Sequence, residues 1–440
     1  MKTLKKVSVI LFLALLWVYP FVLLKAQGIK IKECNTIIHT AASGKDYPGF
    51  WEAVLSFDTT YATVNNATPE QKSFSELLKA LLKGKDTEYI NGLKSLFLST
   101  GDTSVGENCY RLLYDEYFYE FQWGKLLDMD SVYFARKGAV VKDSESVIND
   151  NLYKKLLYAP PTAYNFSDVV DTIPIYAFAY GTPVIELKVN GKSELFMFDT
   201  GAGITSIFST IADKCKVVPV IPDKIVVGTG TNINVYAQYA LCNFKLGNLK
   251  ISHSLAMIQD YKAYEAIDKG LPYKINGILG WETIKNLDVE IDYMHSKIIV
   301  KKPVKKTHSP ASLFYMHVPV VTAYATDGTT LYFGYDTGAG ETNLKSGIKK
   351  KVKFDNLKQG KIQAGSAGGF ETVNVETVKG FSLCLNNINY TFDKLFIDDH
   401  NVASMNLDGH FGGDIAQYGS IHFDYTNKFF EIKNNKINEK

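Results

Sequence analysis

Two aspartates stand at the head of the same five-residue motif in different parts of the chain. Asp199-Thr-Gly-Ala-Gly203 and Asp336-Thr-Gly-Ala-Gly340 each follow a run of apolar and aromatic residues that is typical of a strand. Two carboxyl groups held close together cannot both ionise at low cost, so such a pair holds one shared proton over a broad pH range. The ionised member can take a proton from water, while the protonated member polarises a carbonyl group. The motifs therefore predict hydrolysis by paired acids, without a metal, a cofactor or a covalent nucleophile.

Each aspartate ends a longer segment that occurs twice. In both copies a strand-like run leads to a turn, Asn190-Gly191 or Asp327-Gly328, and a second strand-like run then reaches the aspartate. Asn-Gly and Asp-Gly between apolar runs are strong hairpin signals. The aspartate lies eight residues after the turn glycine in each copy (199 − 191 and 336 − 328). We therefore predict two equivalent hairpins.

The repeat continues beyond the aspartates. Asn276-Gly-Ile-Leu-Gly280 corresponds to Asp408-Gly-His-Phe-Gly412, and an Asp-Tyr pair follows twelve residues later in each copy (292 − 280 and 424 − 412). We therefore expect two copies of one β-rich unit, at residues 167–302 and 313–435, joined by a proline-bearing linker at 303–312.

The duplicated Asp-Thr-Gly-Ala and the later Ile-Leu-Gly resemble those of aspartic peptidases, the retropepsin type in particular, here as a secreted bacterial form. The resemblance covers roughly residues 170–435. It implies an all-β bilobal fold of two barrel-like lobes in one chain, as in pepsin-like enzymes, with Asp199 and Asp336 as the catalytic residues. It also implies supporting roles around the pair for four residues: Thr200, Gly201, Thr337 and Gly338. The threonines are expected to brace the pair by hydrogen bonds, and the glycines to let the backbone pass close to the carboxylates.

Two glycine-rich turns suggest how a peptide is held. Gly228-Thr-Gly230 and Gly365-Ser-Ala-Gly368 each begin 29 residues after an aspartate (228 − 199 and 365 − 336), between strand-like runs. We interpret them as the tips of two flaps whose backbone pairs with an extended substrate. Ordinary hairpin turns are the alternative.

The residue after Asp-Thr-Gly is alanine in both copies, Ala202 and Ala339, where pepsin-like enzymes usually carry serine or threonine. Without a hydroxyl donor at this place, the pKa of the pair should be higher. We therefore expect a mildly acidic to near-neutral optimum. His410 replaces the aliphatic residue of the family pattern, and we expect no catalytic role for it.

The N-terminus has the layout of an export signal. Lys2, Lys5 and Lys6 precede an uncharged run at residues 7–24, and Ala26 is a suitable last residue before cleavage. We predict a signal peptide at 1–26 and a periplasmic, outer-surface or extracellular location, with no membrane span after its removal. An uncleaved anchor is the alternative.

Residues 28–160 are predicted to form an α-helical domain. Phe74, Leu77, Leu78 and Leu81 follow a helical period, and further helices are expected after Asp86-Thr-Glu and from Tyr110 to Trp123. The pattern is similar to tetratricopeptide hairpins but lacks their consensus. Three roles for this domain stay open, which are recruitment of a protein partner or substrate, a prosegment, and assembly. A processing site between Ala159-Pro160-Pro161 and Asp168 would favour the prosegment.

Composition excludes several other classes of protein. The net charge of +2 gives no support for nucleic-acid binding, and five scattered cysteines do not make a disulfide framework. No His or Cys cluster has metal-ligand spacing. The predicted function is therefore an aspartic-type endopeptidase that acts on peptides or proteins. The alternatives are a catalytically silent peptide-binding protein and a scaffold that works through its helical domain.

Overall fold

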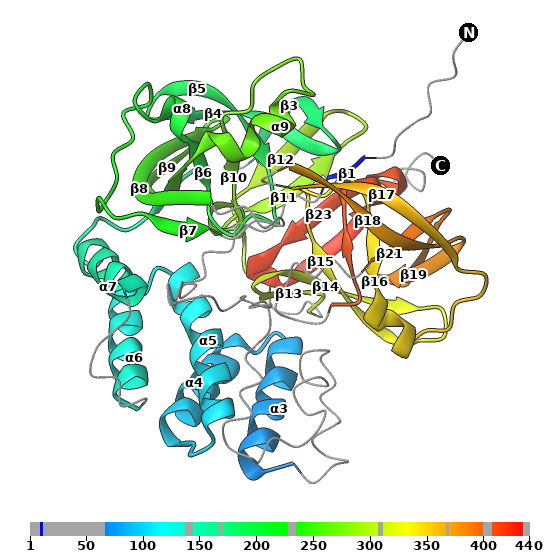
Figure 1. Cartoon of the computed structure of the whole chain (residues 1–440), viewed down its shortest axis with the longest axis horizontal. Helices are drawn as coiled ribbons and strands as arrows, with labels where there is room; N and C mark the ends of the chain where they lie inside the picture. The colour runs from blue at the N-terminus through cyan, green and yellow to red at the C-terminus, as the bar shows by residue number, and fades with distance from the viewer. Residues whose placement is uncertain are drawn as a thin grey trace, which may run out of the picture.

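The chain is mostly β-sheet, preceded by a helical region (Figure 1). The computed structural model describes residues 9–11, 67–136, 144–166, 170–227, 235–306, 311–366, 369–398 and 407–433. The predicted signal peptide lies outside these ranges except for β1 (Val9–Leu11), which runs parallel to residues 363–365. Within the described residues, none of the helices has the length and apolar character that a membrane span requires.

The helical unit, residues 69–156, shows five successive helices in the part of it that the structure describes. Thr68 caps the first of them, because its hydroxyl accepts from the Gln71 amide while the Gln71 side chain accepts from the Thr68 amide. Pro69 occupies the first turn, where its missing N–H costs nothing. The helices are α3 (Pro69–Leu82), α4 (Asp86–Ser99), α5 (Thr103–Tyr119), α6 (Trp123–Arg136) and α7 (Ser144–Leu156).

The expected helix from Tyr110 to Trp123 differs in its limits from α5. The Asp102 side chain accepts from the Ser104 and Val105 amides, so the helix begins earlier than its aromatic stripe suggests. Phe121 has φ of 55°, a left-handed conformation that ends the helix before α6 begins.

The first β region comprises residues 163–301. Its strands are β2 (Ala163–Asn165), β3 (Val170–Ala179), β4 (Thr182–Val189), β5 (Lys192–Phe198), β6 (Ser206–Phe208), β7 (Ile225–Val227), β8 (Val235–Leu246), β9 (Leu249–Gln259), β10 (Gly277–Leu279), β11 (Asp288–Asp292) and β12 (Lys297–Lys301). Short helical turns connect them at α8 (Ser209–Ala212), η1 (Tyr261–Tyr264), α9 (Glu265–Asp268) and α10 (Trp281–Ile284).

The second β region comprises residues 313–433. Its strands are β13 (Leu313–Met316), β14 (Val318–Ala325), β15 (Thr330–Tyr335), β16 (Asn343–Lys345), β17 (Lys358–Ser366), β18 (Gly369–Val378), β19 (Phe381–Leu385), β20 (Ile388–Phe392), β21 (Leu395–Asp398), β22 (Gly409–Phe411), β23 (Ser420–Asp424) and β24 (Phe429–Lys433). It also contains η2 (Ser346–Lys350), η3 (Gly413–Tyr418) and η4 (Tyr425–Asn427).

Corresponding strands of the two β regions pair in the same way. In the first region β5 lies between antiparallel β4 and parallel β10, and in the second β15 lies between antiparallel β14 and parallel β22. The two hairpins differ at their turns. Asn190 and Gly191 both have positive φ in a two-residue loop, whereas in the four-residue connection from Thr326 to Thr329 only Gly328 has a positive φ.

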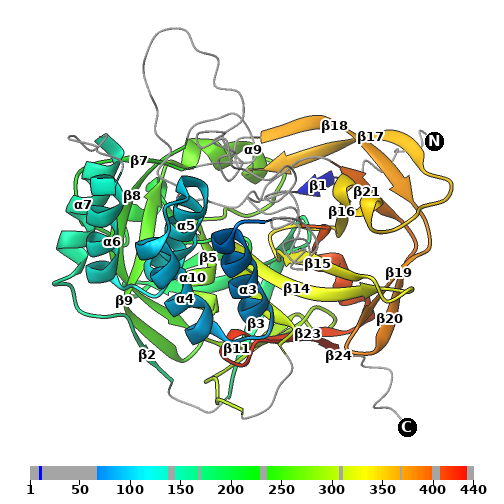
Figure 2. The same ribbon diagram turned by 90° about the horizontal axis from the view of Figure 1, so that it is seen from below.

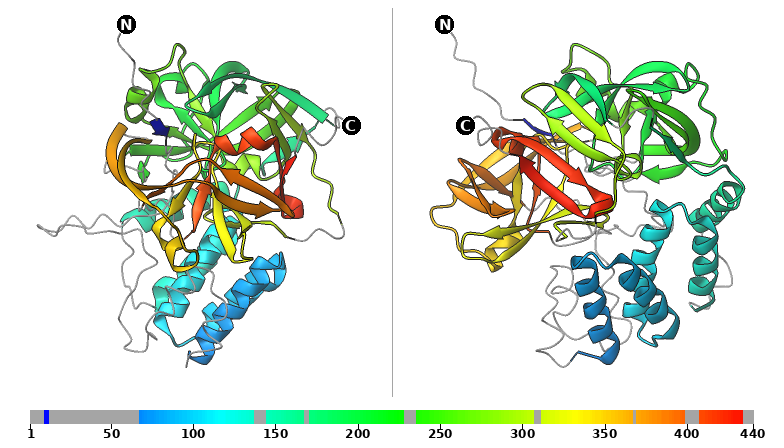
Figure 3. Two further views of the ribbon diagram at one scale, coloured as in Figure 1. Left: turned by 90° about the vertical axis from the view of Figure 1, so that its right-hand side faces the viewer. Right: turned by 180° about the vertical axis from the view of Figure 1, so that it is seen from behind.

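One sheet joins the two β regions. Its strands run in the order β24–β23–β11–β12–β3, so the C-terminal hairpin of the second region pairs with β11 of the first. The right panel of Figure 3 shows the red C-terminal strands beside the yellow-green strands of the first region. The apolar core also crosses element boundaries, since the Phe118 ring of α5 lies 6.2 Å from the Tyr239 ring of β8.

Two cysteines at matching places of the repeat, Cys242 on β8 and Cys384 on β19, are free thiols. Cys242 is buried and Cys384 is partly exposed.

Candidate active site

Each Asp-Thr-Gly loop begins where the central strand of its β region ends. Because β10 runs parallel to β5, the Leu279 carbonyl accepts from the Asp199 amide at 3.1 Å. The Phe411 carbonyl of β22 likewise accepts from the Asp336 amide at 3.0 Å. Both aspartates are therefore fixed by a backbone bond to a neighbouring strand as well as by their own strand.

The two loops bring Asp199 and Asp336 together in the interior. The carboxyl groups are hydrogen-bonded to each other, and the residues are only 1 % and 6 % exposed. Asp199 Oδ1 also accepts from the amides of Gly201 at 2.8 Å and Ala202 at 3.1 Å, and Asp336 Oδ1 accepts from the amide of Gly338 at 2.8 Å. Backbone amides thus donate to the pair, while the position after Asp-Thr-Gly, which is Ala202 or Ala339, offers no hydroxyl.

Thr200 and Thr337 bind each other's loops. The Thr200 amide donates to Thr337 Oγ1 at 2.9 Å, and the Thr337 amide donates to Thr200 Oγ1 at 3.0 Å. Each hydroxyl also donates across the interface, Thr200 to the Tyr335 carbonyl at 2.8 Å and Thr337 to the Phe198 carbonyl at 2.7 Å. These four bonds link the end of β5 to the end of β15, next to the two aspartates in sequence.

The glycines of the motif leave room for the opposite carboxylate. A Cβ on Gly201 would lie 2.3 Å from Asp336 Oδ1, and a Cβ on Gly338 would lie 2.6 Å from Asp199 Oδ1. Both distances are well inside van der Waals contact, so a larger residue at either place would push the carboxyl groups apart.

The two aspartates differ in how readily they ionise. Burial raises the pKa of Asp199 to about 6, against the lowering effect of hydrogen bonds from Asp336, Gly201 and Ala202. Burial and the negative charge of Asp199 raise the pKa of Asp336 well above its usual range. The pair therefore holds one shared proton near neutral pH, and the direction of the two pKa shifts favours Asp336 as the residue that carries it.

Two further threonine–acid pairs, one in each β region, support the two loops. They were not predicted from the sequence. Thr205 donates from its amide (2.8 Å) and hydroxyl (2.5 Å) to Glu282, and Thr342 donates from its amide (2.8 Å) and hydroxyl (2.6 Å) to Asp414. Each threonine stands six residues after its aspartate, and each acid stands two residues after the glycine that closes the apolar stretch. That repeated spacing was the available signal, although the exchange of Glu for Asp obscured it.

A polar pair lies beside Asp199 within the first β region. The Tyr264 hydroxyl donates to Gln259 Oε1 at 3.1 Å, and its ring stacks on Phe208 with centroids 4.3 Å apart. The negative charge of Asp199 contributes to a raised pKa of Tyr264, second to burial. Gln259 is fully buried, and its Nε2 has no partner among the described residues.

Only part of the expected flaps can be placed. Gly228, Gly230 and Gly368 lie outside the described residues. Gly365 lies within β17 and pairs with Phe370, so it belongs to the ladder of the β17–β18 hairpin and precedes its tip. The opposite strand, β18, contacts α9 of the first β region.

His410 lies inside the second β region, on β22 next to Gly334 of β15. A Cβ on Gly334 would lie 2.5 Å from the His410 ring, so the absence of a side chain at Gly334 is what accommodates the imidazole. Burial lowers the pKa of His410 to about 3, which keeps the ring neutral.

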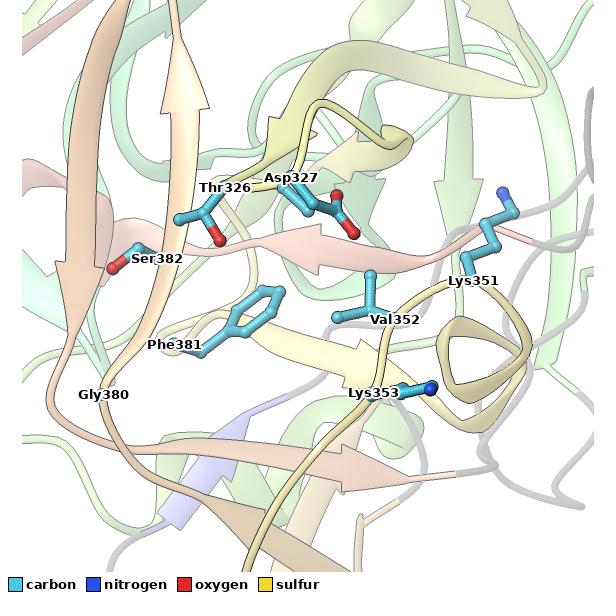
Figure 4. Close-up of a pocket in the computed structure, with 9 residues that line it drawn as sticks. Thr326, Asp327, Lys351, Val352, Lys353, Gly380, Phe381 and Ser382 are labelled. Atoms are coloured by element: carbon cyan, nitrogen blue, oxygen red, sulfur yellow. The ribbon is translucent and has the colours of Figure 1, made fainter.

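A pocket of about 530 Å³ opens at the end of the β14–β15 hairpin remote from Asp336 (Figure 4). Phe381 and Val352 line it together with charged Asp327, Lys351 and Lys353. Neither Asp199 nor Asp336 lines this pocket. Among the described residues, no cluster of three or more His, Cys, Asp or Glu side chains is arranged to hold a metal ion.

A comparison with known protein families gives one match. Residues 185–283 match the family model of aspartyl proteases, a stretch that begins in β4 and includes both Asp199 and Gly280. No curated protein matches the chain. The mostly β architecture is compatible with an aspartic-protease-like fold, and the match supports an aspartic-protease family and, at that level, a hydrolase that cleaves peptide bonds.

Proposed function

We propose that this protein is an aspartic-type endopeptidase in which Asp199 and Asp336 activate one water molecule. The observation that carries the proposal is the buried, mutually hydrogen-bonded pair of carboxyl groups, supplied by two loops of identical sequence. Burial of an acid pair costs stability, because the charge that it carries loses its hydration, and a function explains why the chain keeps it. Paired acids with separated pKa values are instead what proton transfer in both directions requires.

The proposed reaction follows from the ionisation of the pair. Asp199 removes a proton from the water, whose oxygen attacks the scissile carbonyl carbon, while Asp336 donates its proton to the carbonyl oxygen. This gives a neutral tetrahedral diol. The amide nitrogen then takes the proton from Asp199, one hydroxyl of the diol returns a proton to Asp336, and the C–N bond breaks, so that an acid and an amine leave. Proton count is conserved, because the pair begins and ends with one shared proton.

The two β regions are proposed to be the two lobes of a duplicated unit. The matching strand pairs around β5 and β15, the reciprocal threonines and the Thr205–Glu282 and Thr342–Asp414 pairs support this reading. The domain limits proposed from the sequence, 167–302 and 313–435, lie close to the limits of these strands.

The substrate is proposed to be an extended peptide, which the exported protein meets in the periplasm, at the outer surface or outside the cell. An antiparallel hairpin such as β17–β18 offers backbone groups to which an extended chain can bond. The export proposal rests on the N-terminal sequence alone.

The test is cleavage of a diverse peptide mixture between pH 4 and pH 9. Asp199→Asn and Asp336→Asn should each lower kcat/KM by about 10²–10⁴-fold or more, the usual contribution of one acid–base group. Asp355→Asn, at an exposed aspartate of the second β region, is the matched control and should cleave like the wild type. Unfolding curves establish that each variant is folded. A wild-type protein that binds peptides and cuts none across this range would instead support the silent binding protein.

A further inference from the structure

The helical unit lies against the seam where the two β regions meet. Figure 2 shows α3, α4 and α5 lying across the strands, and Figure 1 shows the same helices below β13 and β14. The Tyr89 hydroxyl of α4 lies 4.0 Å from Met316 Sδ of β13, and Phe118 of α5 lies against Tyr239 of β8. One helical surface therefore contacts both β regions.

The charges across this contact are complementary. Asp86 of α4 pairs with Lys428 of the second β region at 2.8 Å, and Glu120 at the end of α5 pairs with Lys285 of the first at 2.5 Å. Asp115 of α5 also pairs with His317. In all three pairs the acid belongs to the helical unit and the base to a β region. The acids thus fasten the helices to both regions at once.

The two lysines that pair with the helical unit, Lys285 and Lys428, are buried or nearly buried. Side-chain exposure is 5 % for Lys285 and 12 % for Lys428, so both ammonium groups depend on their partners. Lys428 has φ of 54°, and its Nζ also lies 3.4 Å from the centre of the Tyr425 ring. A long lysine side chain in a left-handed turn and nearly out of water is a specific arrangement, since burial without a partner would neutralise it.

Aromatic rings continue the contact toward the active site. Tyr119 of α5 meets Tyr315 of β13 edge-on at 5.1 Å, and Tyr315 stacks on Trp281 of α10 at 6.1 Å. Trp281 meets Tyr425 at 5.6 Å. Trp281 and Tyr315 come from different β regions, so this layer lies on the seam itself.

From α10 the contact reaches the loop that carries Asp199. The Trp281 amide donates to the Ala202 carbonyl at 2.7 Å, and the Glu282 amide donates to the Gly203 carbonyl at 3.1 Å. Lys285 follows α10 directly. The segment that binds Glu120 of the helical unit is therefore the one that holds the Asp199 loop from behind.

The joint between the helices and the first β region is itself part of the sheet. β2 pairs with β9, and Thr162 Oγ1 donates to the His253 carbonyl at 2.9 Å. Asn286 donates to the Tyr164 hydroxyl at 2.9 Å, close behind α10. Cutting the chain between Pro161 and Asn165 would break paired backbone rather than a loose connector.

We propose that the helical unit remains attached in the working enzyme and holds the two β regions together behind the carboxyl pair, with Lys285 and Lys428 as positioning residues. This inference rests on the proposed peptidase function for its effect on turnover. It adds a structural role to the three that the sequence left open, and it argues against removal of the helical unit as a prosegment.

Charge reversal in the full-length protein tests the proposal. Lys285→Glu and Lys428→Glu should each lower kcat by roughly 10²-fold with little change in KM, because a displacement of about 1 Å at the reacting groups has an effect of this size. The reciprocal double variants Lys285→Glu/Glu120→Lys and Lys428→Glu/Asp86→Lys should recover most of the loss. Lys79→Glu, at an exposed pair within α3, is the matched control and should change neither constant.

Amide hydrogen exchange gives a readout that does not depend on activity. Lys285→Glu should speed exchange at the Trp281 and Glu282 amides by about tenfold or more, and the double variant with Glu120→Lys should restore protection. If the wild type cleaves nothing yet this exchange pattern appears, the docking stands and the peptidase proposal fails.

Three results would overturn the docking role. The first is that kcat and amide hydrogen exchange are unchanged in Lys285→Glu and Lys428→Glu. The second is that the reciprocal double variants are folded but do not recover kcat, and the third is the isolation of a fully active protein from which processing has removed residues 67–156.

Discussion

Thr200 and Thr337 exchange amide-to-hydroxyl hydrogen bonds at 2.9 and 3.0 Å, so each loop of the candidate active site is held by the other. Neither loop can settle in its final position before both β regions are folded and in contact. The carboxyl pair is thus a property of the assembled structure.

The first prediction concerns this threonine pair. Thr200→Val keeps the shape but leaves the Thr337 amide and the Tyr335 carbonyl unpaired in the interior, which should lower the free energy of unfolding by about 1–3 kcal/mol for each unpaired group. Thr200→Ser keeps the hydroxyl, so its free energy of unfolding should fall much less. Urea denaturation measures the free energy of unfolding of both variants, with Thr322→Val, at a partly exposed threonine of β14, as the control. Equal stability of the Val and Ser variants would contradict the bracing role.

The second prediction concerns the close approach at Gly201. Gly201→Ala would place a Cβ 2.3 Å from Asp336 Oδ1, so the carboxyl groups must separate. We expect kcat to fall by roughly 10²-fold or more. Gly347→Ala is the matched control, because nothing lies within 4 Å of its Cβ position. Peptide cleavage measures both variants, and full turnover by Gly201→Ala would show that the pairing of the acids is not needed.

The third prediction concerns the acidic limb of the pH profile. Asp199 must be ionised to accept a proton, and burial raises its pKa to about 6, so kcat/KM should rise as pH increases through that region. Ala202→Ser offers a hydroxyl donor to ionised Asp199. It should therefore lower the pKa of Asp199 and move the acidic limb of the kcat/KM profile toward lower pH. A wild-type limb at the ordinary carboxyl pKa of about 4 would contradict this assignment.

The fourth prediction concerns Glu116 on α5, inside the contact between the helices and the β regions. Burial raises its pKa from 4.5 to about 7, against the lowering effect of Lys428 and Lys285, while Asp86 and Glu120 raise it further. Tyr89 and Tyr425 also face this group.

The sign for Glu116 follows from proton linkage. Because the folded protein binds this proton more tightly, its contribution to stability is complete below about pH 4.5 and is lost as pH rises through about 7. Glu116→Gln should therefore remove roughly one proton's worth of pH dependence from the free energy of unfolding over this range. Urea denaturation at pH 5, 6, 7 and 8 measures it. Unchanged dependence in the Gln variant would place the titrating groups elsewhere, Glu282 first among them.

The sequence predicted most about this protein in the segments where a local pattern occurs twice. Two Asp-Thr-Gly-Ala-Gly motifs, each after a turn at the same spacing, pointed to two hairpins and to the residues that meet at their ends. The limits of α5 were harder to predict, because an aspartate cap at Asp102 and a left-handed Phe121 decide them more strongly than the aromatic stripe does.

By itself, the sequence of this protein determined which residue types carry the chemistry and which strands present them, because turns and strand periods depend on near neighbours in the chain. Only the tertiary structure decided which acid keeps the proton, how Glu282 and Asp414 support the loops, and where the helical unit docks. These features depend on burial and on contacts between residues far apart in the chain, from Thr342 with Asp414, 72 positions apart, to Glu120 with Lys285, 165 positions apart. No local pattern encodes such distances, so they appear only when the chain is folded.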